Sequence, residues 1–153
     1  MKKKLWDHIL LAALLTAITA GAAMLFVDTK SAWYVSLSQP KIQPPPWVFA
    51  AVWSLLYALY AVVLTRCQQK QAHPRAYLLL ALQAVCNILW CLTYFTLHLL
   101  YVPFAVIVAY AVLNYLTIRR LYPTDRLSAW LLVPAELWLL LAAVINYLTI
   151  LLN

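Results

Sequence analysis

The chain has 153 residues, of which 67% are hydrophobic and 10% charged, and its formal net charge is +7. Soluble domains are about half apolar and about a quarter charged, and a core of this size cannot hide the excess apolar surface. The composition therefore excludes an ordinary soluble domain. It predicts one membrane domain that covers residues 1–153.

Five apolar stretches are each about as long as the ~20 residues that cross a ~30 Å hydrocarbon core. In lipid they must be helices, because every backbone N–H and C=O needs a partner within the segment. We therefore expect an all-α membrane protein with a bundle of five transmembrane helices. The expected helices cover about residues 8–27, 46–65, 77–98, 102–121 and 128–151, and an external loop covers about residues 28–45.

The first apolar stretch follows three lysines, as the apolar part of a signal peptide does. It is longer than a typical signal segment, and no clear small-residue cleavage site precedes a soluble domain. We expect it to be a retained helix.

Basic residues are divided unevenly between the two sides of the predicted bundle. Nine lie at the N-terminus and in the segments 66–76 and 119–127, and two lie on the other side. The positive-inside rule then predicts a cytoplasmic N-terminus and an external C-terminus. Topology and contact with anionic lipid account for the net charge, so no nucleic-acid partner is expected. The nine are Lys2, Lys3, Lys4, Arg66, Lys70, Arg75, Arg119, Arg120 and Arg126, and the two are Lys30 and Lys41.

The external loop and the start of the second helix combine prolines with aromatic residues. The run 44–46 cannot continue a preceding helix, but proline suits the first turn of the next one. We expect a semi-rigid, extended loop close to polyproline II. Trp33, Tyr34 and Trp47 fall near the water–lipid boundary, where an aromatic belt is one explanation. A belt does not account for Trp53, which lies deeper.

Three of the expected helices carry stripes of aromatic and amide side chains at spacings of three and four residues. Either the stripes pack helices together, or they line a cavity whose flat walls and few polar groups suit a large planar ligand. The stripes are Phe49, Trp53, Leu56, Tyr57 and Tyr60; Gln83, Asn87, Trp90, Cys91, Tyr94 and His98; and Pro134, Trp138, Ala142, Asn146 and Thr149. The fourth helix adds Tyr110 and Asn114 on one face.

Glu136 is the acid that lies well inside a predicted span, and intramembrane carboxylates are candidate functional groups. It lies about 200° around the helix from Trp138. We therefore expect a neutral, hydrogen-bonded acid at a helix contact, or one that reaches the near interface. His98 either pairs with a ligand carboxylate or extends to the headgroups. No triad, paired carboxylates, phosphate loop or metal-ligand spacing is visible, so no metal site is expected.

These residues resemble the signature of the translocator protein family, the tryptophan-rich sensory proteins (TspO), which are related to the peripheral benzodiazepine receptor. The resemblance covers most of the chain in the family's order. It is carried by Trp33, Tyr34, Leu37, Pro40, Pro44, Pro45, Trp47, Val48, Phe49, Val52, Trp53 and Tyr57; by Asn87, Trp90, Tyr94 and Phe95; and by Pro134, Trp138, Ala142 and Asn146.

The resemblance implies a homodimer in a bacterial cell membrane and a pocket beneath the first loop. The implied ligand is a porphyrin, protoporphyrin IX or haem, or another hydrophobic planar molecule, with no cofactor required. The implied role is a sensor or regulator of porphyrin metabolism and stress response. The implied ligand-binding residues are Trp33, Tyr34, Trp47, Phe49, Trp53, Tyr57, Asn87, Trp90, Tyr94, Trp138, Ala142 and Asn146.

Three other functions remain open. The first is light- and oxygen-dependent degradation of the porphyrin, with Trp53 and Trp138 as the catalytic residues that the resemblance implies. The second is transport of porphyrins, and the third is a purely structural role for the aromatic residues. The chain also departs from the family at Ala50–Ala51 and at Ala135–Glu136, which changes the finer shape of the pocket. No basic residue follows Tyr147, so sterol binding is not supported.

Overall fold

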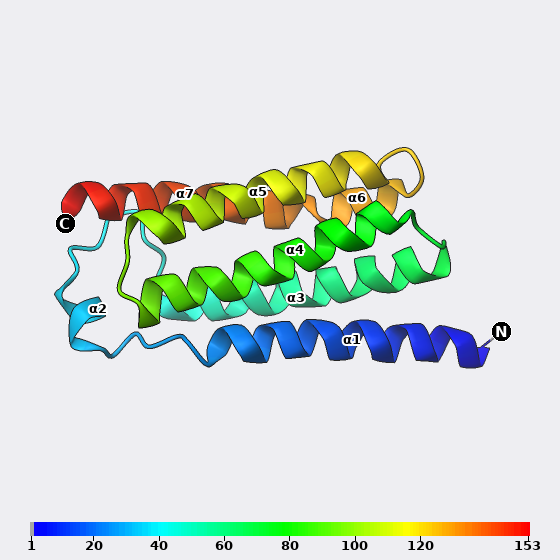
Figure 1. Ribbon diagram of the computed structural model, residues 1–153, viewed down its shortest axis with the longest axis horizontal. Helices are drawn as coiled ribbons and strands as arrows, with labels where there is room; N and C mark the ends of the chain where they lie inside the picture. Colours follow the sequence, from blue (N-terminus) through cyan, green and yellow to red (C-terminus); the bar gives the residue numbers. More distant parts are fainter. Residues whose placement is uncertain (1) are drawn as a thin grey trace.

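The computed structural model describes residues 2–153, with the backbone alone for residues 2 and 3, so the charges predicted at Lys2 and Lys3 lie outside the described side chains. Within the described residues, five helices are long and apolar enough to cross a membrane, which confirms the five-helix, all-α prediction. Figure 1 shows the long helices side by side along the long axis of the molecule. The five spans are Lys4–Met24, Pro46–Gln69, Pro74–Thr96, Tyr101–Leu121 and Arg126–Leu152.

The chain order is α1, α2, α3, α4, η1, α5, α6 and α7. Prolines fix two of the starts, because Pro46 and Pro74 occupy the first turns of α3 and α4, where a missing N–H costs nothing. His73 caps α4, and its Nδ1 accepts the Arg75 N–H at 3.2 Å. The bounds are α1 Lys2–Met24, α2 Ala32–Ser36, α3 Pro46–Gln69, α4 Pro74–Cys91, η1 Leu92–Thr96, α5 Tyr101–Leu121, α6 Arg126–Leu131 and α7 Val133–Leu152.

The third and fifth spans are irregular at points that the sequence periodicity does not reveal. The third continues from α4 into η1, a π-helical turn of a kind that often occurs at functional sites. The fifth breaks at Leu132, between α6 and α7, two residues before Pro134. Proline has no N–H to donate and clashes with the preceding turn, which explains the break.

The external loop contains a short helix, so the prediction of an extended loop is wrong for α2. Ser31 precedes α2, and its Oγ accepts the Tyr34 N–H at 3.3 Å. Such local side-chain bonds favour a helical turn, and hydrophobic periodicity does not detect them. The backbone returns to polyproline-like angles at Leu37 and at Pro45.

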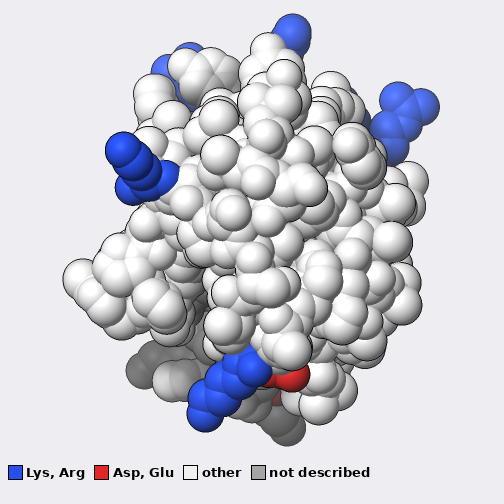
Figure 2. Space-filling view, turned by 90° about the vertical axis from the view of Figure 1, so that its left-hand side faces the viewer, with Lys and Arg blue, Asp and Glu red and all other residues white. Residues whose placement is uncertain are grey.

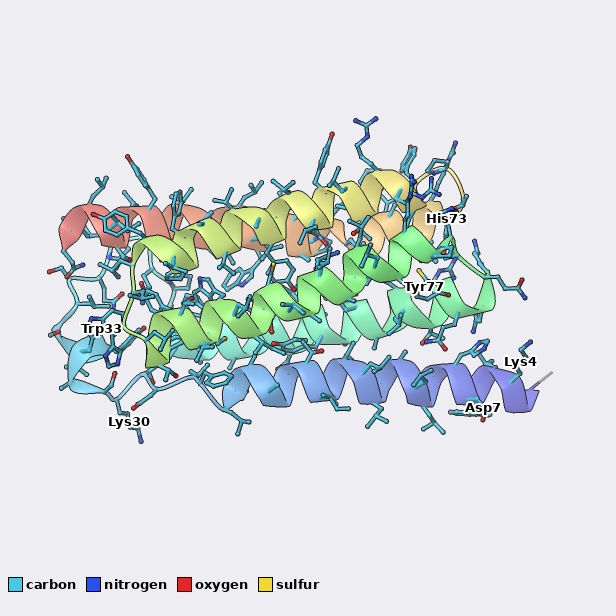
Figure 3. The ribbon with its side chains drawn as sticks, in the orientation of Figure 1. Lys4, Asp7, Lys30, Trp33, His73 and Tyr77 are labelled. Carbon is cyan, nitrogen blue, oxygen red and sulfur yellow. The ribbon has the colours of Figure 1, made fainter. Side chains whose placement is uncertain are left out.

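The two ends of the bundle differ in composition. We call the end with residues 25–45 and the turn 97–100 the loop end, and the end with the turns 70–73 and 122–125 the basic end. Figure 3 shows Lys4 and His73 at the basic end, and Lys30 and Trp33 at the loop end. Figure 2 looks onto the loop end, whose surface is mostly uncharged. The structure thus gathers most of the described basic residues at one end, and the side of the membrane that this end faces stays a prediction.

In the part of the chain that the structure describes, three buried clusters follow one another through the bundle. One at the basic end joins α3, α4, α5 and α6 around Val63 and Leu121. A central one joins α5 and α7 around Ile107 and Leu139. The third, at the loop end, surrounds Tyr94. Large apolar side chains that face outward are exposed, as expected where lipid is the solvent.

Candidate ligand-binding site

Aromatic rings from α2 and η1 pack together at the loop end. The Trp33 ring meets the Tyr94 ring edge-on with centroids 5.4 Å apart, and it stacks on the His98 ring at 4.7 Å. The Tyr34 ring lies 5.5 Å from that of Phe95. Edge-on and offset contacts of this kind stabilise aromatic pairs by about 0.5–1.5 kcal/mol beyond burial. Residues of α2 therefore cover the end of the third span.

Trp90 connects this region to the centre of the bundle. Its ring stacks parallel to that of Tyr94 at 5.5 Å, with an interplanar angle of 6°. Its indole N–H donates to Asn146 Oδ1 at 3.2 Å, and Asn146 Nδ2 donates to the Ala142 carbonyl at 3.0 Å. Packing thus brings stripe residues from the third and fifth spans into direct contact.

A second group of predicted site residues lies between α3 and α4. The Trp53 and Tyr57 rings are 5.8 Å apart, and the Tyr57 hydroxyl donates to Asn87 Oδ1 at 2.8 Å. Asn87 is buried, and Trp53 packs against the central cluster that contains Ala142. This group therefore adjoins the Trp90 region through a shared set of neighbours.

A third group joins α3 to α7. The Phe49 ring meets the Trp138 ring edge-on at 5.3 Å. The indole N–H of Trp138 is buried and has no hydrogen-bond partner among the described residues. A buried donor without an acceptor is unusual, because its desolvation costs about 1–3 kcal/mol.

Trp47 is placed apart from the other predicted site residues. It is 71% exposed at the start of α3. Among the described residues its ring makes none of the close aromatic contacts that join the other tryptophans of the site. The structure thus brings eleven of the twelve predicted positions into three adjoining groups and leaves Trp47 outside them. We use the term aromatic site for these eleven residues: Trp33, Tyr34, Phe49, Trp53, Tyr57, Asn87, Trp90, Tyr94, Trp138, Ala142 and Asn146.

The sequence that forms the five spans matches a known family. The sequence profile of the TspO/MBR family matches residues 9–152. The chain belongs to the TspO/MBR family.

Curated relatives in the TspO/MBR family match along nearly their whole length. The tryptophan-rich protein TspO of Archaeoglobus fulgidus is 30% identical over 94% of this chain and 96% of its own. Protein CrtK of Rhodobacter capsulatus is 28% identical over 90% of this chain and 89% of its own. The tryptophan-rich sensory protein of Cereibacter sphaeroides is 27% identical over 92% of this chain and 89% of its own.

This TspO/MBR protein also has a buried network of polar side chains that could not be predicted from the sequence. The Tyr60 hydroxyl lies 2.9 Å from Gln83 Oε1 and 3.0 Å from Asn114 Oδ1. Gln83 Nε2 donates to Thr117 Oγ1 at 2.7 Å. The sequence placed Tyr60, Gln83 and Asn114 each on a helix face. Only the packing of α3, α4 and α5 shows that these three residues contact one another.

The network reaches the intramembrane acid. Asn114 Nδ2 donates to Glu136 Oε2 at 2.8 Å, which confirms the prediction of a hydrogen-bonded acid at a helix contact. Glu136 borders a groove between α5 and α7 with Val108 and Tyr115, away from the Phe49–Trp138 contact. His98, whose place the sequence left open, is exposed and stacks on Trp33.

At the basic end lies a polar cluster centred on Asp125, which no sequence pattern predicted. Arg66 donates to both carboxylate oxygens, with distances of 3.0 and 2.7 Å, and Ser128 Oγ donates at 2.6 Å. Lys70 Nζ lies 3.1 Å from Oδ1. Burial alone would raise the pKa of the Asp125 carboxyl, but the hydrogen bonds from Arg66, Ser128 and Lys70 outweigh burial and hold that pKa below its ordinary value.

Proposed function

We propose that this protein is a membrane sensor that binds a planar tetrapyrrole, such as protoporphyrin IX, in the aromatic site beneath α2. The family membership supports this proposal, as do relatives whose printed names describe tryptophan-rich sensory proteins. A large flat ligand requires apolar ring faces together with a few polar groups that fix its orientation. The aromatic site has both.

The observation that carries the proposal is the unpaired indole N–H of Trp138. It is buried beside Phe49, within the aromatic site. A ligand acceptor, such as a carboxylate or a carbonyl of a porphyrin, would remove the desolvation cost of this donor. Nearby amides already have partners, because Asn87 accepts from Tyr57 and Asn146 accepts from Trp90.

Entry of a ligand requires the segment 28–45 to move, because its aromatic residues cover the site. Trp33 and Tyr34 are held mainly by ring contacts. The side-chain hydrogen bond from Gln43 Nε2 to the Tyr34 hydroxyl is long, at 3.3 Å. A segment with few buried polar contacts opens at low free-energy cost. We therefore infer that residues 28–45 act as a lid that opens and closes over the ligand.

A second candidate function is photo-oxidative degradation of the bound porphyrin. The site holds two oxidisable indoles, Trp53 on α3 and Trp138 on α7, and each makes a close ring contact. An electron-rich ring beside an excited pigment is a possible electron donor, with molecular oxygen as the oxidant. This alternative uses the same site and differs in turnover under light.

The test is a titration of the purified protein in detergent with protoporphyrin IX in the dark, followed by tryptophan fluorescence. We expect saturable binding that Trp138→Phe weakens about fivefold, since that change removes one hydrogen-bond donor but keeps an aromatic ring. Trp53→Phe should weaken binding less, because only contact area is lost. Illumination of the same samples distinguishes turnover from binding by the loss of porphyrin absorbance.

Trp130→Phe is the matched control, because Trp130 is 62% exposed on α6, away from the aromatic site. It removes one tryptophan signal without touching the proposed pocket. Equal affinities in the Trp138→Phe and Trp130→Phe variants would refute the assignment of the site. Bleaching no faster than that of free porphyrin would leave a sensor without the degrading activity.

A further inference from the structure

A cavity of about 470 Å³ opens at the basic end, on the opposite side of the bundle from the aromatic site. Its walls are the α3–α4 turn and the α5–α6 turn, which Figure 1 shows at the same end of the molecule. Cys67, Ala76 and Leu121 form part of its apolar wall, and Lys70, His73 and Arg120 supply cationic or hydrogen-bonding groups.

The carboxylate that lines this cavity, Asp125, already has hydrogen-bond partners at both oxygens. Both oxygens of Asp125 accept hydrogen bonds from Arg66, and the carboxylate is only 6% exposed. Arg66 alone balances the charge of Asp125, so Lys70 adds an excess positive charge. The Lys70 side chain is 48% exposed, and an ammonium group that bonds Asp125 through one hydrogen has two more to donate.

Arg120 adds a second cation without a counter-charge. Among the described residues, the ion pairs within bonding distance are those of Asp125 with Arg66 and Lys70, and Arg120 takes part in neither. Its guanidinium presents a fork of N–H donors that matches the oxygens of a phosphate group. His73 lies on the same wall as the cap of α4, where the helix dipole adds partial positive charge.

We propose that this cavity binds a phosphate group, with Lys70 and Arg120 as its charged ligands and His73 as a further polar contact. Two sources carry this chemistry, the headgroup of an anionic phospholipid and a small soluble phosphate compound. A cationic ligand or a metal ion is disfavoured, because the carboxylate that lines the cavity is already paired with two cations. The volume accommodates a glycerophosphate headgroup, and the apolar wall suits the start of its acyl chains.

The experiment compares Arg120→Gln with Arg119→Gln. The two arginines are neighbours in sequence, both are exposed, and Arg120 lines the cavity whereas Arg119 does not. Both variants lose the same charge, so general electrostatic attraction falls equally. Binding of short-chain phosphatidylglycerol and of inorganic phosphate to the full chain in neutral detergent is measured by calorimetry. Short-chain phosphatidylcholine serves as the zwitterionic lipid reference.

We expect Arg120→Gln to weaken binding of the anionic probe about tenfold, the loss of one charge-assisted contact, and Arg119→Gln to weaken it less than twofold. Lys70→Gln should weaken it by a similar factor while Arg66 still holds Asp125. Binding of phosphatidylglycerol without competition from phosphate identifies a lipid headgroup site. Competition by phosphate at equal or lower concentration identifies a soluble ligand.

Equal weakening in Arg120→Gln and Arg119→Gln would overturn the proposal, since it would mean diffuse attraction to a basic surface. Failure of both phosphatidylglycerol and inorganic phosphate to bind saturably would overturn it as well. Folding of each variant is checked independently by circular dichroism. If Arg120→Gln does not fold, the comparison of Lys70→Gln with Arg119→Gln decides the result.

Discussion

The loop end and the basic end of the bundle are held together by different forces. At the loop end, the rings of Trp33, Tyr34 and Tyr94 contact one another, and the hydrogen bonds between Ser38 and Asn153 that tie the loop to α7 are exposed. At the basic end, Asp125 is held by Arg66 and Ser128 through hydrogen bonds of 2.6–3.0 Å. Separating two apolar rings leaves no unpaired charge, whereas separating an ion pair leaves two. The comparison supports the proposal that the loop end acts as a lid while the basic end stays rigid.

The largest effect is expected from breaking the rigid end. Asp125→Ala removes the carboxylate and leaves Arg66 and Lys70 as uncompensated charges, which should lower the free energy of unfolding by about 3 kcal/mol. The measurement is unfolding by denaturing detergent, monitored by circular dichroism. Asp28→Ala is the control, because Asp28 is exposed at the loop end and accepts one backbone N–H, from Lys30. A similar loss in both variants would remove the contrast between the ends.

Low pH should destabilise the basic end of the wild-type protein but not that of the Asp125→Asn variant. Because the folded pKa of Asp125 is depressed, its stabilisation is fully present above the ordinary value of 3.8 and is lost as the pH falls below that value towards the folded pKa. Asp125→Asn has no carboxyl to titrate there. The stability difference between wild type and Asp125→Asn should therefore shrink between pH 5 and about pH 2. A difference that stays constant over this range would contradict the role given to the carboxylate.

The buried network between the two ends sharpens the comparison. Tyr60→Phe removes the hydroxyl that lies between Gln83 and Asn114, and should lower the free energy of unfolding by about 1 kcal/mol, the usual size for a hydrogen bond inside a membrane protein. Tyr57→Phe, which affects the single bond to Asn87, should cost less. The two variants are compared by the same unfolding assay. A larger loss for Tyr57→Phe would place the more important network in the aromatic site.

The smallest effect on global stability is expected at the lid. Trp33→Ala removes the ring contacts to Tyr94 and His98, so the amides of residues 28–45 should exchange hydrogen about fivefold faster, which corresponds to about 1 kcal/mol. Unfolding of the five spans should hardly change. Trp47→Ala is the control, because Trp47 is largely exposed. Equal exchange in the two variants would mean that the aromatic contacts do not hold the lid.

Several features of the protein could be predicted from the sequence because they follow from short-range rules. Apolar runs of membrane length predicted the five spans, and Pro46 marked the start of α3, whereas α4 begins at Pro74, a few residues before the expected start at about residue 77. The spacing of Trp53, Trp90 and Trp138 placed each on a helix face. The capped turn of α2 was missed, because a Ser31 bond to the backbone leaves no trace in hydrophobic periodicity.

The residues themselves determined a membrane-embedded helical bundle, its segregated charge and its aromatic stripes, since hydrophobicity and helix geometry act along the chain. Only the tertiary structure decided which stripes meet. It put Trp90 against Asn146, left the Trp138 indole without a partner and Trp47 outside the site, and joined Arg66 to Asp125 across 59 positions. The physical reason is that such pairs depend on the rotation and register of whole helices, which packing fixes and no local pattern encodes.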